Sequence, residues 1–195
     1  MNFSPEREQQ IKSMIQTAHA ETVAFCKTVK PGKFSSESKT TSVAKFDVDF
    51  SSFAGIVAKT TSNLKISEII SNLRENPFLL QNSAPFKVTS LIKYPFGDDF
   101  VFVAQMEGKM GTSEQLLTFS VQNEGKQTVL VQKWCELEEI KAKTDRTKAI
   151  NVFFLEEKEN KTEITFYSHQ DIPKAPAIIL NMHAKKRAQV LERFE

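Results

Sequence analysis

Long apolar runs, cysteine and an excess charge of one sign are all scarce in this chain of 195 residues. No stretch is apolar enough to span a bilayer, and the polar start, residues 1–8, has no signal region. We therefore expect a soluble cytoplasmic protein, or an exported or periplasmic one if a signal peptide has been removed. The net charge of +2 argues against nucleic acid as a partner, because phosphate binding needs clustered positive charge.

Motifs for metal, cofactor or nucleophile chemistry are also missing. Cys26 and Cys135 are the only cysteines, and they show no metal-ligand spacing. One disulfide bridge stays open, but two buried thiols are favoured. The sequence contains no Gly-x-Ser-x-Gly, no phosphate loop, no His-Glu-x-x-His and no dinucleotide fingerprint. We expect no metal and no cofactor.

Three histidines are the remaining candidates for acid–base chemistry. His19 and His183 fall in predicted helices, where we expect them on the surface. His169 and Asp171 alternate on a predicted strand, so they could form a base and its orienting acid. A hydrogen bond at the sheet edge is the favoured alternative, because no nucleophile is evident beside them. The predicted catalytic set is therefore empty, with His169 and Asp171 as weak candidates.

Hydrophobic periodicity predicts an α+β protein. Ser4 can cap a first helix with Pro5 at its first position, and the helix is expected to end near Lys27. Strands grouped together rather than alternating with helices favour an antiparallel sheet. A short helix is predicted over 65–75. The expected strands cover 34–41, 45–50, 53–61, 86–94, 100–107, 115–122, 128–136, 149–156 and 162–168.

The last segment, after Pro173 and Pro176, predicts a closing helix over 173–195. A bent sheet under a long helix predicts an internal hydrophobic cavity, with a solid core as the alternative. The chain has sixteen phenylalanines against two tyrosines and one tryptophan. This excess suits either a cavity lining or a solid core, because phenylalanine carries bulk without a polar group. The helix has one apolar stripe with a wider front, made of Ala177, Leu180, Ala184, Ala188, Leu191 and Phe194, with Ile178, Ile179 and Met182.

Two stretches of the chain have a familiar pattern. One is Ile92-Lys-Tyr-Pro-Phe-Gly-Asp-Asp-Phe-Val-Phe102, and the other covers 152–157, 163–173 and 180–182. Both resemble START domains, which belong to the Bet v 1-like group. The resemblance implies a helix-grip fold, in which a curved antiparallel sheet wraps the C-terminal helix. It implies a single START-like domain over 1–195, with a helix in 1–30, the sheet in 34–172 and the closing helix in 173–195. Asp98 stands where the family commonly has Arg.

The resemblance and the predicted cavity together favour a non-catalytic carrier or sensor of a lipid or other hydrophobic small molecule. Two alternatives stay open: an enzyme of the cyclase or hydratase kind, and a protein-interaction module. We expect a monomer. The basic triplet 185–187 favours the solvated side of a helix, with transient contact to a membrane surface as the alternative. Arg146 could meet a lipid head group or lie on the surface. The predicted ligand-binding residues are Phe102, Met106, Phe119, Trp134, Phe153, Tyr167, Leu180 and Met182.

Overall fold

The computed structural model of the chain describes residues 3–49, 51–77, 86–108, 111–172, 176, 178, 181 and 184–194. In this part of the chain, nine strands form one sheet in the order β1-β2-β3-β9-β8-β7-β6-β5-β4, and all neighbours are antiparallel. The strands are β1 (Ser35–Ser36), β2 (Ser42–Val48), β3 (Ser51–Ser62), β4 (Phe86–Phe96), β5 (Asp99–Gly108), β6 (Gly111–Glu124), β7 (Gln127–Trp134), β8 (Lys148–Lys158) and β9 (Lys161–Asp171).

The predicted order of helix, strands, short helix, six strands and closing helix is confirmed. The six-stranded meander β4–β9 is only part of the sheet, because β3 pairs with β9 and brings β1 and β2 with it. In the described chain the helices are α1 (Pro5–Thr28), α2 (Ile66–Glu75) and η2 (Ala184–Phe194), of which η2 is the longest described part of the closing helix.

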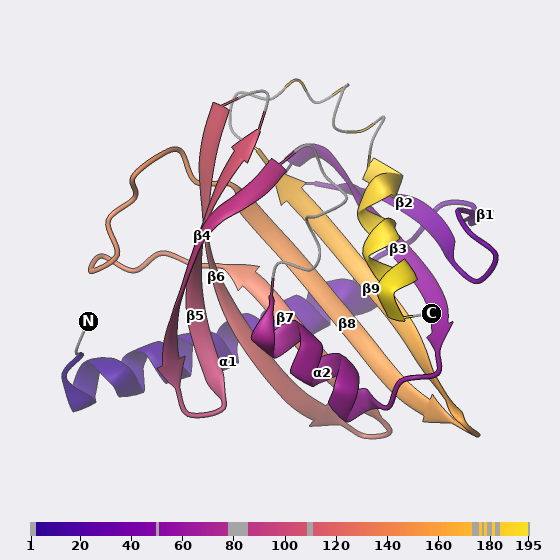
Figure 1. Cartoon of the computed structure of the whole chain (residues 1–195), viewed down its shortest axis with the longest axis horizontal. Helices are drawn as coiled ribbons and strands as arrows, with labels where there is room; N and C mark the ends of the chain where they lie inside the picture. The colour runs from indigo at the N-terminus through magenta and orange to yellow at the C-terminus, as the bar shows by residue number, and fades with distance from the viewer. Residues whose placement is uncertain are drawn as a thin grey trace.

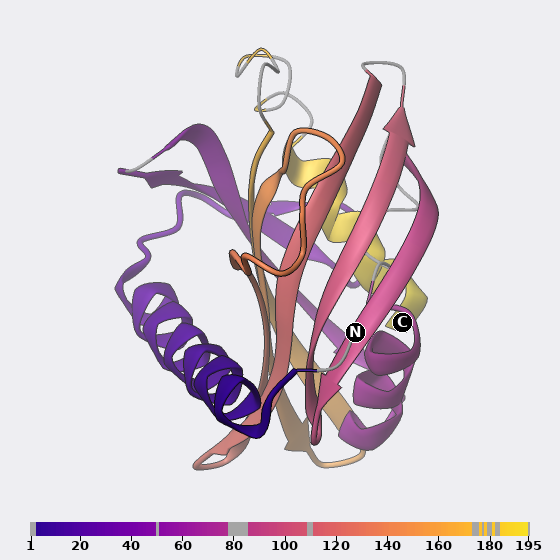
Figure 2. The same ribbon diagram turned by 90° about the vertical axis from the view of Figure 1, so that its left-hand side faces the viewer.

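Helices cover the two faces of the curved sheet differently. Figure 2 shows α1 on one side of the sheet, here called the outer face, and α2 with η2 on the other side, the inner face. Figure 1 shows η2 lying across the β3 and β9 side of the sheet and α2 lower on the same face. Because both faces are covered, the middle parts of β6, β7 and β8 are buried on both sides, and each face carries its own apolar core.

The first helix begins as the sequence predicts. The Oγ of Ser4 accepts a hydrogen bond from the backbone N–H of Arg7 at 3.2 Å, and Pro5 occupies the first helical position. The helix packs on β6, β7 and β8 through a buried stripe that includes Ile11, Ile15 and Val23. The surface expectation for His19 was wrong: this residue belongs to the same stripe and is fully buried.

Gly55 permits a close approach of two strands, as its place in a predicted strand suggested. It pairs with Phe46 of β2, and the ring of Phe46 lies where a side chain at position 55 would stand. Any larger residue at 55 would displace this ring, which packs on the outer face against Phe25 and Tyr167.

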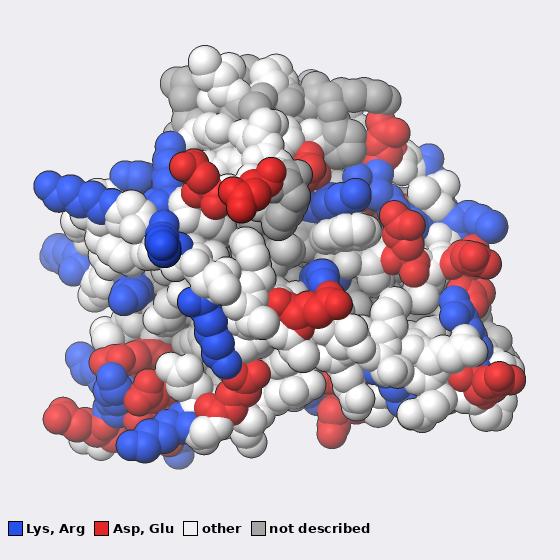
Figure 3. All heavy atoms as spheres, turned by 180° about the vertical axis from the view of Figure 1, so that it is seen from behind, with Lys and Arg blue, Asp and Glu red and all other residues white. Residues whose placement is uncertain are grey.

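The surface carries both signs of charge. Figure 3 shows positive and negative side chains interspersed over the face that carries α1. Among the described residues, no helix is both long enough and apolar enough to cross a membrane. Cys26 and Cys135 are free buried thiols, as favoured above, and burial raises the pKa of each to about 12.

Candidate ligand-binding site

Four of the predicted ligand-binding residues lie together on the inner face of the sheet. Phe102 and Met106 come from β5, Phe119 from β6 and Phe153 from β8, and each is at most 3% exposed. They share one core with side chains of α2 and η2, among them Leu73 and Leu191. The inner face and the closing helix therefore enclose one continuous apolar region.

Aromatic contacts divide this region into two groups. The rings of Phe100 and Phe119 stack with their centroids 4.3 Å apart, at the β5–β6 side. At the β8–β9 side, Phe153 lies 4.7 Å from Phe166 and 6.5 Å from Phe194 of η2. These rings carry bulk with no polar atom, so the region favours apolar ligands.

Tyr167 does not join these residues, so its expected place was wrong. Successive residues of a strand point to opposite faces, and Phe166 points inward, so Tyr167 points to the outer face. Its ring there lies 5.6 Å from that of Phe154. Burial raises the pKa of Tyr167. The aromatic character of the strand did not reveal which of the two neighbours faces inward.

Trp134 is the last residue of β7 and packs against the cores of both faces. The Nζ of Lys148 lies 4.4 Å from the ring centroid, so the indole holds a cation on one face. Leu180 and Met182 lie outside the described residues, and so does His183. Of the front of the closing helix, Ile178 is described and is 72% exposed, so at this residue the expected widening of the buried stripe was wrong.

A row of polar side chains crosses three neighbouring strands on the largely apolar inner face. Ser168, Asn151 and Gln132 are register partners on β9, β8 and β7, and all three are at most 3% exposed. The Oγ of Ser168 donates to Oδ1 of Asn151 at 2.9 Å, and Nδ2 of Asn151 donates to Oε1 of Gln132 at 3.2 Å. Nε2 of Gln132 donates to the carbonyl of Pro77 at 3.1 Å.

This polar row has hydrogen-bonding capacity to spare. Each amide has two N–H donors and an oxygen with two lone pairs. Between described residues, Gln132 and Asn151 each donate once and accept once. Buried amides are costly unless satisfied, so a row of this kind in an apolar face is suited to orienting a bound molecule. Sequence reasoning missed it, because single polar residues in apolar strands are common.

The closing helix is hydrogen-bonded to the start of β3, where this strand does not yet pair with β9. The strand pairs with β9 only from Ile56 onward, which leaves the backbone of Ala54 without a strand partner on that side. Asn181 replaces that partner: its Oδ1 accepts from the N–H of Ala54 at 2.7 Å, and its Nδ2 donates to the carbonyl of Ser52 at 3.1 Å. Nη2 of Arg187 donates to the carbonyl of Ala54 at 2.6 Å.

His169 lies beside these hydrogen bonds but has the wrong acidity for a base at neutral pH. It is 3% exposed. Burial lowers its pKa to about 4, and the nearby charge of Arg187 lowers it further than Asp171 raises it. Above about pH 4 the imidazole is therefore neutral and weakly basic. A buried and weakly basic imidazole does not favour the acid–base pair that His169 and Asp171 could have formed.

The remaining candidates have structural partners. Arg146 reaches the outer face, where its Nε donates to Oε1 of the buried Glu114 at 2.9 Å, so it does not face the inner core. The side chain of Asp98 is almost fully exposed at the turn and lies 3.7 Å from Arg74. Among the described residues, no group of three or more His, Cys, Asp or Glu is placed to hold a metal ion.

Comparisons with known proteins agree on the class of fold. No protein-family profile matches the chain, and no curated protein matches its sequence. Solved structures do match, and they share a curved antiparallel sheet gripping a C-terminal helix, which is the helix-grip class.

The particular members are START domains. Human StAR-related lipid transfer protein 5 matches with a TM-score of 0.78 at 11% identity, over 96% of this chain and 95% of that one. A fragment of the STAR-related lipid transfer protein of Xanthomonas axonopodis matches with a TM-score of 0.69 at 11% identity, over 82% and 94%. Human STARD10 gives 0.63 at 10% identity, over 100% and 82%. The chain therefore has the START helix-grip fold, as the resemblance implied.

Proposed function

We propose that the chain binds a lipid or other hydrophobic small molecule between the inner face of the sheet and the closing helix. It acts as a non-catalytic carrier or sensor. The carrying observation is the hydrogen-bonded polar row of Ser168, Asn151 and Gln132 within a largely apolar face. Pockets for apolar ligands combine such a lining with a few polar groups that fix orientation. The structures with the same fold are named as lipid transfer proteins, which supports the same function here.

The proposed ligand space adjoins Phe102, Met106, Phe119 and Phe153, with Trp134 at its rim and Leu180 and Met182 contributed by the closing helix. Affinity comes from apolar ligand surface leaving water, at about 25 cal/mol per Å² before the costs of ordering. We further propose that residues 1–195 act as one START-like domain, as a monomer in the cytoplasm that meets membrane surfaces transiently.

The direct test is a native mass spectrum of the purified protein, followed by extraction of bound molecules. A stoichiometric adduct of lipid mass is the expected result. If the purified protein carries no ligand, it is incubated with a total lipid extract, and uptake of a lipid then tests the proposal. No uptake by folded protein would overturn the proposal.

Variants of the polar row test where the ligand binds. The triple substitution Gln132→Leu, Asn151→Leu and Ser168→Ala removes the side-chain partners together and leaves only the carbonyl of Pro77 without its donor, so the protein should keep most of its stability. Lipid uptake should fall about tenfold or more, because each lost hydrogen bond contributes about 1 kcal/mol. The matched control is Thr118→Val, which removes a buried hydroxyl from the outer face of β6. Equal uptake by the triple variant and the control would place the ligand elsewhere.

A further inference from the structure

The charge of Arg187 has no counter-charge in the described protein. Every Asp and Glu of the chain except Glu195 is described, and no described carboxylate forms an ion pair with Arg187. Phe194, the residue before Glu195, lies seven positions after Arg187 in η2, which is about 10 Å or more of axial rise. Burial lowers the pKa of Arg187 to about 10, and no neighbouring acid offsets that shift.

Most of the donors of this guanidinium are unused by described residues. An arginine has five N–H donors in a planar fork. Nε donates to the carbonyl of Ala184 in the same helix at 3.2 Å, and Nη2 donates to the carbonyl of Ala54 at 2.6 Å. Those two bonds fix the plane of the guanidinium but bring no negative charge. The other donors, including both on Nη1, have no acceptor among the described residues.

The guanidinium lies next to the polar row. Its acceptor Ala54 precedes by two residues Ile56, which is the register partner of Ser168 at the end of that row. Two residues along a strand span about 7 Å and lie on the same face. Arg187 itself comes from η2, which covers the inner face. One side of the apolar region therefore carries the guanidinium of Arg187 and, two strand residues away, the neutral donors and acceptors of the polar row.

A partly buried cation without a counter-charge costs free energy unless something pairs with it. Elsewhere in the described chain the buried charge of Glu114 has its partner in Arg146. A ligand anion is the group that would complete the arrangement at Arg187, since a planar guanidinium fork matches carboxylate and phosphate oxygens.

We propose that Arg187 binds the anionic head group of an acyl lipid, a carboxylate or a phosphate, while the polar row holds neutral oxygens next to it and the aromatic core holds the chain. This assignment rests on the proposed function, because it names the chemistry of the ligand at the same site.

The test compares lipids that differ only in the head group. Delipidated protein is titrated with oleate, oleyl alcohol and oleoyl lysophosphatidate, each below its micelle concentration. The wild type should bind the better of the two anions about 10- to 100-fold more tightly than the alcohol, as expected of a charge-assisted hydrogen bond in a partly buried site. Tighter binding of oleate identifies a carboxylate ligand, and tighter binding of lysophosphatidate a phosphate ligand.

Variants then assign the preference to one side chain. Arg187→Met should bring the anion-to-alcohol ratio to about one while the alcohol still binds, and Arg187→Lys should restore part of the ratio. Arg187→Gln keeps a donor for the carbonyl of Ala54, so it serves if the methionine variant folds poorly. The control is Lys186→Met, which removes the same charge from an exposed neighbouring position.

Two negative results have different meanings. Failure of the folded wild type to bind any of the three lipids would overturn the proposed function together with this assignment. Binding of the alcohol as tightly as the anions, or an unchanged ratio in Arg187→Met, would overturn the role of Arg187 alone and leave the carrier proposal standing.

Discussion

The two faces of the sheet treat buried charge in opposite ways. On the outer face, the fully buried Glu114 pairs with Arg146, and the backbones of the same segments bond through Glu114 to Asp145 and Thr147. On the inner face, Arg187 has only carbonyl partners among the described residues. The ion pair of Glu114 and Arg146 holds a loop in place and leaves no charge free to bind a ligand. The guanidinium of Arg187 lies beside the polar row without a carboxylate partner, so it can bind an anion. The first arrangement suits a structural role and the second a ligand-binding role.

The largest expected effect comes from breaking the outer pair. Glu114→Leu leaves Arg146 partly buried without its counter-charge, so the free energy of unfolding should fall by about 3 kcal/mol. Urea denaturation measures the loss. The double variant Glu114→Leu, Arg146→Met should recover most of it, because removing both charges also removes the burial cost. Lipid preference should not change in either variant. A changed preference would mean that the two faces are not independent.

His169, which lies near Arg187, gives a somewhat smaller effect that depends on pH. The pKa of His169 is lowered to about 4 by burial and by the charge of Arg187, with Asp171 and a backbone bond at Phe53 opposing the shift. The unfolded chain therefore binds a proton before the folded one does. The lowered pKa of His169 therefore adds to the free energy of unfolding. This contribution is complete above about pH 6.5 and is lost as the pH falls toward 4, and it amounts to up to about 2–3 kcal/mol.

Comparing the wild type with His169→Gln by urea denaturation at pH 7 and pH 4.5 isolates this contribution. The wild type should lose more stability than the variant between the two values. His19 is also buried with a lowered pKa, so it contributes in the same direction, but it is present in both proteins and cancels in the difference. An identical loss in both proteins would show that His169 is not shielded from water.

The sequence predicted the fold better than the site. Elements such as α1 follow from local signals: Ser4 caps it and Pro5 starts it. The pairing of β3 with β9 joins residues about a hundred positions apart, and no local pattern signals it. Without that pairing, the nine-stranded sheet and the free edge at Ala54 could not be foreseen.

Which residues form the site depends on which side chains of each strand face inward and on single long-range contacts. Phe166 and Tyr167 look equally suited to a pocket in the sequence, yet only the first faces inward. Gln132 and Asn151 become a row only when β7 and β8 align. Arg187 stood in a basic triplet that suggested a wet helix surface. Its approach to β3 depends on how the closing helix crosses the sheet, which helical periodicity alone does not specify.

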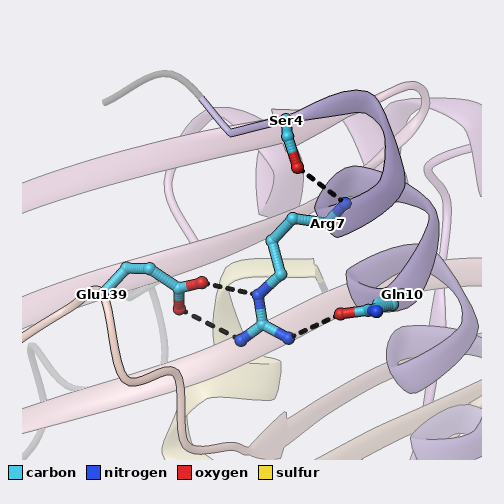
Figure 4. A network of polar contacts seen from close by, with 4 residues as sticks. All are labelled: Ser4, Arg7, Gln10 and Glu139. Carbon is cyan, nitrogen blue, oxygen red and sulfur yellow. Dashed lines mark hydrogen bonds and ion pairs between the residues drawn. The ribbon is translucent and has the colours of Figure 1, made fainter.

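The smallest expected effect concerns a pair on the rim of the outer face. Figure 4 shows Arg7 in the first turn of α1 reaching Glu139 in the loop between β7 and β8, with Gln10 accepting from the same guanidinium. Both side chains of the ion pair are about one-third exposed (34% and 32%), so water and salt screen the attraction. The hydrogen bond from Arg7 lowers the pKa of Glu139, so its contribution is lost when acid protonates the carboxylate.

Glu139→Gln should therefore destabilise the protein far less than Glu114→Leu, although both changes remove a carboxylate from an arginine on the same face. The measurement is urea denaturation of both variants at low and high salt. The small loss in Glu139→Gln should vanish at high salt, whereas the loss in Glu114→Leu should persist, because the carboxylate of Glu114 is shielded from solvent. If the two losses were equal, burial would not be what distinguishes a structural charge in this protein, and an unpaired Arg187 would no longer indicate a ligand anion.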